Sequence, residues 1–156
     1  MTNRVPGVLE RLMGEANPAP ARFSLEQLKD SIVRDLEDLL NTRCGAAHDA
    51  FDAHPEVRAS VLNYGLADFA GFCLSSSEDR AAICASLKDA IERHEPRLTG
   101  VSAVLEPSGF GINRLQFVIN ATLRVADGLE PVNFNAVLQP SSLHFAIGKG
   151  GRMPRP

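Results

Sequence analysis

Residues 115–125, LQFVINATLRV, decide the fold because their apolar residues alternate with polar ones more regularly than elsewhere in the chain. The apolar positions begin at Leu115 and recur at every second residue up to Val125. A period of two places them on one face of a β-strand and the intervening residues on the other. We therefore predict a half-buried antiparallel strand, with one face on the core and one in water.

Shorter alternating segments lie on both sides of this strand. Residues 101–105 alternate before it, and residues 132–138 and 143–147 alternate after it. Turn-forming residues separate the segments, as in consecutive antiparallel strands. The pattern predicts a meander of three or four strands. The turn signals are residues 107–111 (PSGFG), the pair Asp127-Gly128, and Pro140.

A long amphipathic helix is predicted ahead of the strands. Ser24 and Gln27 have the spacing of a capping box, in which two side chains satisfy backbone N–H groups at a helix start. Apolar residues then follow at spacings of three and four up to Leu40, which is the period of a helix with one buried face. The helix should end near Arg43, because Gly45 supplies a stop signal.

A second helix is predicted directly before the strands. The serines at 75–77 offer an N-cap, with Ser75 and Glu78 three residues apart, and apolar residues recur every four positions over residues 83–91. Pro96 should end this helix, because proline has no N–H donor and clashes with the preceding turn. Residues 56–62, between the two helices, predict a single helical turn.

Helices followed by a strand meander predict an α+β fold. The helices should pack on one face of a three- to four-stranded antiparallel sheet. We assign the folded domain to residues 23–148. Residues 1–22 are expected to form a short amphipathic segment and a Pro-rich linker, and residues 149–156 a mobile basic tail.

The composition argues against several classes of partner and location. The 156 residues include 16 basic and 19 acidic side chains, for a net charge of −3, and no basic run occurs. A nucleic-acid binder would need a basic patch. The three cysteines are odd in number and lie in or beside apolar segments, as reduced thiols do in cytosolic proteins. No window approaches the roughly 20 apolar residues of a membrane span, so we expect no membrane insertion.

The chain has no clear motif for catalysis or metal binding. Glycosidases use two carboxylates around one bond, and Glu37 with Asp38, Glu26 or Glu95 are the candidates here. Carboxylates on polar helix faces are usually solvated, and no apolar pocket that would raise the pKa of an acid catalyst is indicated. The four histidines and three cysteines lack the spacing of metal ligands. We therefore expect no catalytic residue, no metal site and no cofactor.

Two features point to protein–protein contacts instead. Glu95-Pro96-Arg97 holds an acidic and a basic side chain at the corner between a helix and a strand, and we expect this pair to point outward to a partner. Within one molecule, the same residues would be a helix stop with an ion pair worth under about 1 kcal/mol. The outermost strand of the meander is either capped locally or offers unpaired backbone groups to another chain.

Four motifs follow one another along the chain: Leu36–Arg43, Ser60–Phe69, Ile91–Leu98 and Glu130–Phe134. In this order they resemble the TssE family, a baseplate subunit of type VI secretion systems that is similar to wedge proteins of contractile phage baseplates. The resemblance extends from about Phe23 to Leu138.

This resemblance implies an interaction module without catalytic activity, although related proteins have carried a lysozyme-like label. Similar proteins contact the TssF and TssG wedge core, in a baseplate that also holds TssK, through a corner that matches Glu95, Pro96 and Arg97. They are thought to start assembly of the sheath subunits TssB and TssC, with a sheet that resembles the interlocking domain of those subunits. The implied sheath-facing edge contains Val132, Phe134, Leu143 and Phe145.

The location implied by the resemblance is the cytoplasm, in a baseplate close to the inner membrane. Two other functions stay open at this point. One is a peptidoglycan hydrolase, which would need two carboxylates in one cleft. The other is a baseplate subunit of a different contractile particle, such as a phage tail.

Overall fold

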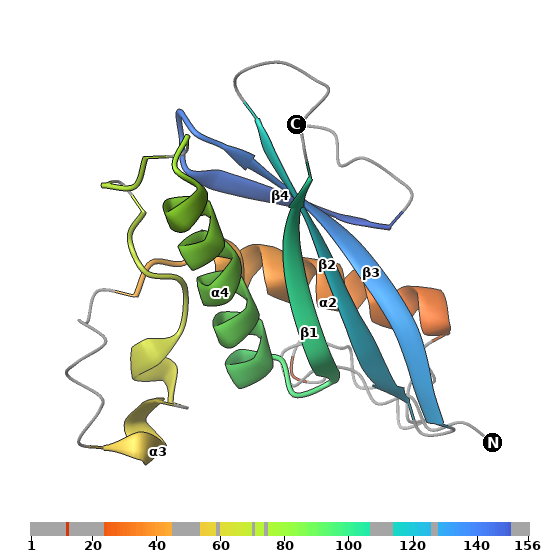
Figure 1. Cartoon of the computed structure of the whole chain (residues 1–156). Helices are drawn as coiled ribbons and strands as arrows, with labels where there is room; N and C mark the ends of the chain where they lie inside the picture. Colours follow the sequence, from red (N-terminus) through yellow and green to blue (C-terminus); the bar gives the residue numbers. More distant parts are fainter. Residues whose placement is uncertain are drawn as a thin grey trace.

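In the computed structural model, helical elements precede a sheet, as the sequence predicts (Figure 1). The structure describes residue 12 and residues 24–44, 54–58, 60–69, 71–73, 75–106, 114–125 and 128–150. The helical elements are α2 (Leu25–Asn41), α3 (Pro55–Arg58), the 3₁₀ turn η2 (Val61–Asn63) and α4 (Ser77–His94). The strands are β1 (Leu98–Glu106), β2 (Leu115–Val125), β3 (Gly128–Gln139) and β4 (His144–Lys149).

The four strands form one antiparallel sheet in the order β1-β2-β3-β4. Ile119 in β2 lies opposite Ala103 in β1 and Phe134 in β3, so the apolar residues of neighbouring strands share one face. Val125 pairs with Gly128, as expected for a hairpin with a two-residue loop. The predicted α+β fold with an antiparallel meander is therefore confirmed, and the number of strands in it is four.

The two long helices begin at side-chain caps. Ser24 and Gln27 form the predicted capping box of α2: the Ser24 hydroxyl accepts from the Gln27 N–H at 3.1 Å, and the Gln27 side chain accepts from the Ser24 N–H at 2.8 Å. The cap of α4 is Ser76, whose hydroxyl accepts from the N–H of Asp79. The cap therefore lies within the predicted serine run 75–77 and is Ser76 rather than Ser75, because consecutive serines offer equivalent hydroxyls that the sequence does not distinguish.

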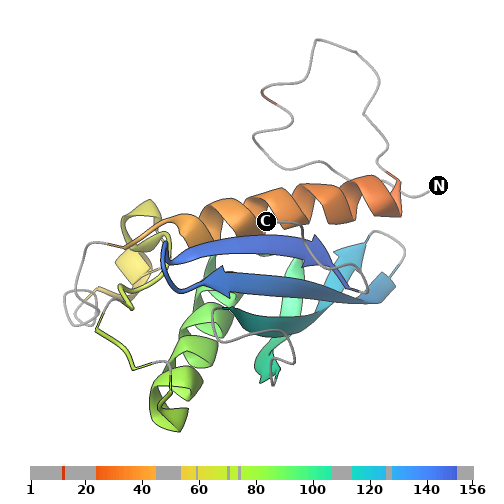
Figure 2. The same cartoon turned by 90° about the horizontal axis from the view of Figure 1, so that it is seen from above.

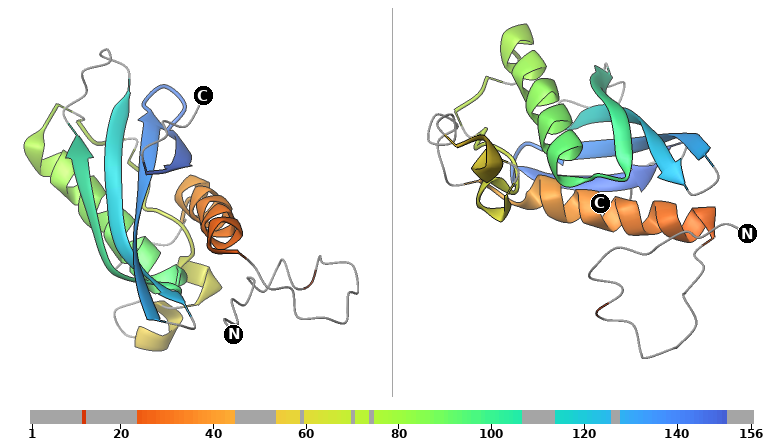
Figure 3. Two further views of the ribbon diagram at one scale, coloured as in Figure 1. Left: turned by 90° about the vertical axis from the view of Figure 1, so that its right-hand side faces the viewer. Right: turned by 90° about the horizontal axis from the view of Figure 1, so that it is seen from below.

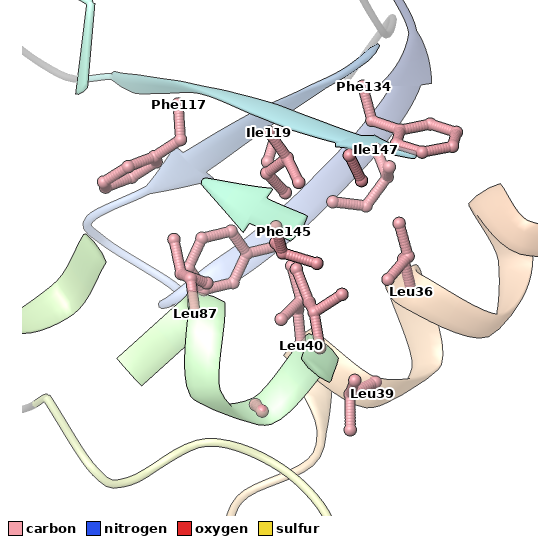
Figure 4. Packing of buried hydrophobic residues seen from close by; sticks show 14 of the residues in the cluster. Leu36, Leu39, Leu40, Leu87, Phe117, Ile119, Phe134, Phe145 and Ile147 are labelled. Atoms are coloured by element: carbon pink, nitrogen blue, oxygen red, sulfur yellow. The ribbon is translucent and has the colours of Figure 1, made fainter. Parts of the chain in front are cut away.

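Both long helices lie on the same face of the twisted sheet, α2 along β4 and α4 along β1 (Figures 2 and 3). Their apolar stripes meet the inward-facing residues of the strands in one core. Leu36 and Leu40 from α2, Leu87 from α4 and the aromatic rings of Phe117 and Phe145 all belong to this core (Figure 4). The centroids of these two rings are 6.2 Å apart.

The end of the folded domain differs from the prediction. Lys149, which we assigned to a mobile tail, is the last residue of β4, and its ammonium lies 2.8 Å from Glu26 and 2.7 Å from Asp30 of α2. The sheet therefore extends past residue 148, and its last strand is joined to the first turns of α2. The predicted N-terminal segment 1–22, apart from Leu12, and residues 151–156 of the predicted tail lie outside the described residues.

Candidate functional site

The corner between α4 and β1 is a β-turn over residues 95–98. The carbonyl of Glu95 accepts from the N–H of Leu98 at 3.1 Å, which closes the turn. Pro96 occupies the second position of the turn, where its fixed φ and missing N–H are favourable. Glu95 is also the C-cap of α4, and its own N–H donates to Ile91. The proline therefore ends the helix and turns the chain into the sheet, as the sequence predicts.

The Glu95 carboxylate binds Arg97 through three donors. One oxygen accepts from the Arg97 backbone N–H at 3.1 Å and from Nε at 2.7 Å, and the other oxygen accepts from Nη2. The guanidinium also reaches α2, where Nη1 donates to the Ser31 hydroxyl at 3.2 Å and Nη2 pairs with Asp35. A bidentate carboxylate–guanidinium pair of this kind has a defined orientation. Arg97 thus ties the corner to the middle of α2.

This arrangement corrects the expectation that the charged pair points outward. Glu95 is 4% exposed, and the Arg97 side chain is 19% exposed because it lies against α2. The corner presents Pro96, which is exposed, and the outer side of Asp35, whose side chain is 40% exposed. Sequence reasoning missed Ser31 and Asp35 because they lie more than 60 residues before Arg97, and no local pattern connects them.

The electrostatics of the corner keep the guanidinium charged. Burial alone would lower the pKa of Arg97, but the hydrogen bonds and charge of Glu95, and then those of Asp35, outweigh burial and raise this pKa. Arg97 is therefore a permanent cation. Its two carboxylate partners give the cluster an excess of negative charge beside the exposed face of Asp35.

A second cluster lies beside the corner and is built around the buried amide of Asn63. Its Nδ2 donates to the carbonyl of Arg58 at 2.9 Å, and its Oδ1 accepts from the Cys44 thiol at 3.5 Å. The Asn63 carbonyl lies 2.9 Å from Nε2 of His94. Since a carbonyl only accepts, Nε2 must carry the proton. Through its side-chain amide and its backbone carbonyl, Asn63 therefore connects α3 and the segment after α2 to the end of α4.

The ring of Tyr64 packs edge-on against that of His94, with centroids 5.2 Å apart. Burial lowers the pKa of His94 and outweighs the opposite effect of the hydrogen bond to the Asn63 carbonyl, so the neutral imidazole is favoured. Burial, followed by the negative charges of Asp38, Asp35 and Glu95, raises the pKa of Tyr64. The hydroxyl of Tyr64 therefore interacts electrostatically with the carboxylates of the corner, which shows that the two clusters adjoin.

Gly65 allows this loop to pack against the end of α2. Its φ is +111°, and an added Cβ would lie 2.5 Å from the carbonyl oxygen of Thr42. The next residue, Leu66, is fully buried and forms an isolated parallel bridge with Arg43. The Leu66 N–H donates to Thr42 at 2.9 Å, and its carbonyl accepts from Cys44 at 2.8 Å.

The residues predicted for a sheath-facing edge lie mostly in the core. Val132 and Phe134 belong to β3, an interior strand of the sheet, and their side chains are buried, as is that of Phe145 in β4. Leu143 is half-buried in the turn before β4, with a φ of +52°. The alternation of Val132, Phe134 and Phe145 was read correctly as strand structure, but it points these side chains inward, and Leu143 precedes the strand in which it was predicted. A partner at this edge would meet backbone groups rather than these side chains.

The outer edge of β4 is capped by Asn41 of α2. The Asn41 amide accepts from the Phe145 N–H at 2.8 Å and donates to the Phe145 carbonyl at 2.9 Å, so it imitates a neighbouring strand. At the other edge of the sheet, Glu92 of α4 accepts from the N–H of Val101 in β1 at 3.2 Å. Both edges of the sheet are therefore partly closed by helix side chains, one of the ways in which proteins protect sheet edges.

Asn41→Ala is expected to destabilise the fold by about 1–3 kcal/mol, because it leaves two backbone groups of Phe145 without their partner. Hydrogen exchange at the Phe145 amide should accelerate more than exchange at neighbouring ladder amides, which NMR would resolve. Thr42→Ala is a matched control one residue away, since the Thr42 hydroxyl donates to Asp38 of its own helix. Unchanged protection of Phe145 in Asn41→Ala would contradict the capping role.

The surface hollows do not resemble a carboxylate active site. A hollow of about 480 Å³ between the start of α2 and the sheet contains Glu26, Lys29 and Lys149. The hydrogen bond from Lys149 and its charge lower the pKa of Glu26, whereas an acid catalyst needs a raised pKa. Among the described residues, no group of three or more His, Cys, Asp and Glu side chains is arranged to hold a metal ion.

The comparisons with known proteins agree with the interpretation of the motifs. Residues 26–127 match the family described as baseplate wedge protein gp25. This range contains both clusters described above, together with α2, α4, β1 and β2. No curated protein matches the sequence significantly. In the part of the chain that the structure describes, no helix is long and apolar enough to cross a membrane.

A solved structure, "The baseplate complex from the type VI secretion system", contains a chain with a similar fold. The TM-score is 0.51 at 17% sequence identity, and the alignment covers 73% of this chain and 96% of the other. The resemblance to baseplate wedge proteins stated from the sequence is confirmed by the family match, which spans well over half of the residues. The chain belongs to the baseplate wedge protein gp25 family.

Proposed function

We propose that this protein is the TssE-type subunit of a type VI secretion baseplate, where it joins the wedge complex and initiates assembly of the contractile sheath. The observation that carries the proposal is the family match over residues 26–127. The similar fold of a chain in a type VI baseplate complex supports the choice of a secretion baseplate over a phage tail. The protein would then act in the cytoplasm, in a baseplate close to the inner membrane.

In this proposal the protein has no catalytic activity. Lys149 lowers the pKa of Glu26, the carboxylate in the hollow between α2 and the sheet. Glu95 is another candidate acid, and both of its carboxylate oxygens accept hydrogen bonds from Arg97. Neither group is free to donate a proton to a glycosidic oxygen, as a glycosidase acid must. The geometry of these residues favours a structural role over hydrolysis.

The wedge contact is proposed at the corner of Glu95, Pro96 and Arg97, with TssF and TssG as partners and TssK in the same assembly. The internal network suggests a division of roles. Glu95 and Arg97 hold the corner rigid against α2, and Pro96 with the outer side of Asp35 meets the partner. A rigid corner binds more tightly than a mobile one, because less conformational entropy is lost on binding.

The sheath contact is proposed at the C-terminal strands, where a strand from TssB or TssC would extend the sheet. Along a strand, the backbone N–H and C=O groups of successive residues point to opposite edges, so those of every second residue share an edge. Because Phe145 faces Asn41, the backbone of Ile147 is directed to the same outer edge. Val132, Phe134, Phe145 and the adjoining Leu143 would support this edge from within by fixing the strands to the core.

The wedge contact is tested with a pair of exposed prolines. Pro96→Arg should weaken binding to a purified TssF–TssG complex about tenfold, because it places a long cationic side chain at the contact. Pro131→Arg is the matched control, since Pro131 is also exposed but lies on β3. Binding is measured by titration, and the melting temperature of each variant is recorded alongside.

Neither substitution removes a side chain of the Glu95–Arg97 network, so both variants should remain folded. Equal affinities for Pro96→Arg, Pro131→Arg and the unaltered protein would place the wedge contact away from this corner. Failure of the unaltered protein to bind TssF–TssG would reject the wedge role itself.

A further inference from the structure

The most exposed apolar side chains near the two clusters are Val61 and Leu62, at 82% and 67% exposure. They are adjacent in η2, and we call them the apolar tip. η2 and α3 lie at the lower left of Figure 1, beside the C-terminal end of α4 and on the side of that helix away from the sheet. Isolated apolar residues are common on protein surfaces, but two adjacent residues that are each more than half exposed are a candidate contact.

The turn that carries the apolar tip is fixed at both ends. On the N-terminal side, the Ser60 hydroxyl accepts from the Leu62 N–H at 3.3 Å and donates to the Val57 carbonyl at 2.7 Å. On the C-terminal side, Asn63 is 2% exposed and binds both Arg58 and His94. The Cys44 thiol adds a contact to the Leu62 carbonyl at 3.7 Å.

Burial changes within a few residues, from the exposed side chains of the turn to the buried side chain of Leu66. Leu66, four residues after Leu62, is fully buried, and Gly65 allows the backbone to pass within van der Waals contact of Thr42. Several hydrogen bonds, some of them part-buried, therefore fix a backbone that exposes Val61 and Leu62. Because the turn is already fixed, little conformational entropy is lost when these two apolar side chains are buried against a partner.

We propose that the apolar tip inserts into an apolar pocket on another protein of the baseplate wedge. This inference rests on the proposed function. A second copy of this chain is a poor occupant, because two convex tips facing each other bury only on the order of a few hundred Å². A stable dimer needs about 1,600 Å². A tip this small is useful as one anchor within a multi-subunit interface whose other contacts, such as the Pro96 corner, hold the partners together.

The test replaces the tip and measures binding to the purified TssF–TssG complex. Val61→Ser with Leu62→Ser should weaken binding at least about 30-fold, which corresponds to the loss of a hot spot. Leu129→Ser is the matched control, since Leu129 is 69% exposed but lies on β3. The affinity of the Leu129→Ser variant should stay within about twofold of that of the unaltered protein, because most substitutions outside an anchor change the binding free energy little.

Circular dichroism and the melting temperature verify that each variant is folded. If the serine pair lowers stability, Val61→Thr with Leu62→Ala is the second variant, because threonine keeps the branched shape of valine. Unchanged affinity in a folded tip variant overturns the inference and leaves the wedge role standing. Absence of binding by the unaltered protein rejects the wedge role and the inference together. A concentration-dependent dimer that the tip variant abolishes, seen by sedimentation, would assign the tip to a second copy.

Discussion

Arg97→Ala is expected to lower the free energy of unfolding by about 3 kcal/mol. The substitution removes the two guanidinium donors of the Glu95 carboxylate, which is 4% exposed, and leaves it the backbone N–H of residue 97. Breaking one side of a buried ion pair costs about 3–5 kcal/mol. The lower end applies because Arg97 is partly exposed. Urea unfolding of the purified protein would measure the change. Arg124→Ala is the control, because Arg124 is exposed and only its backbone is known to bond the corner.

A second variant separates the charge from the contact. Glu95→Gln combined with Arg97→Ala should be more stable than Arg97→Ala alone, because no unpaired charge stays buried. If Arg97→Ala lost less than about 1 kcal/mol, the pair would be as weak as a surface salt bridge, and holding the corner would not be its role.

Gly65→Ala is expected to cost about 3 kcal/mol or more. Two effects add at this position: a φ of +111° that side chains rarely adopt, and a Cβ that would lie 2.5 Å from the Thr42 carbonyl oxygen. Backbone strain and overpacking each cost about 1–3 kcal/mol. Because the clashing atom belongs to the backbone, it cannot rotate away. Thermal and urea unfolding would both register the loss.

Two other glycines separate the effects. Gly100 also has a positive φ, +62°, but an added Cβ there meets nothing within 4 Å, so Gly100→Ala should show the conformational cost alone. Gly71 has open space and no positive φ, and Gly71→Ala should be nearly neutral. Equal losses in Gly65→Ala and Gly100→Ala would show that the approach to Thr42 is unimportant.

Local patterns in the sequence were sufficient for the elements but not for the contacts between them. The alternation of residues 115–125 predicted β2 with the observed ends, and the capping box predicted the start of α2. These signals succeed because they depend on neighbours within a few residues. The turn over Glu95-Pro96-Arg97 was predicted for the same reason, since proline acts on the backbone beside it.

The orientation of the corner could not be predicted from the sequence. A charged pair after a helix looks the same whether it faces water or another helix, and Asp35 lies 62 residues from Arg97. The cap of β4 by Asn41 spans 104 residues and has no sequence signal either. The segment of residues 56–62 was predicted as one helical turn, but the structure divides it into α3 and η2, and this division creates the apolar tip.

The pairing of α2 with β4 has a consequence for biosynthesis. The hydrogen bonds between Asn41 and Phe145 join the first long helix to the last strand, 104 residues later. Translation proceeds at about 5–20 residues per second, so the apolar face of α2 waits several seconds for the strand that covers it. During that interval the exposed apolar face of α2 is a binding site for a chaperone. A chain truncated before residue 144 lacks β4, so this face of α2 stays uncovered.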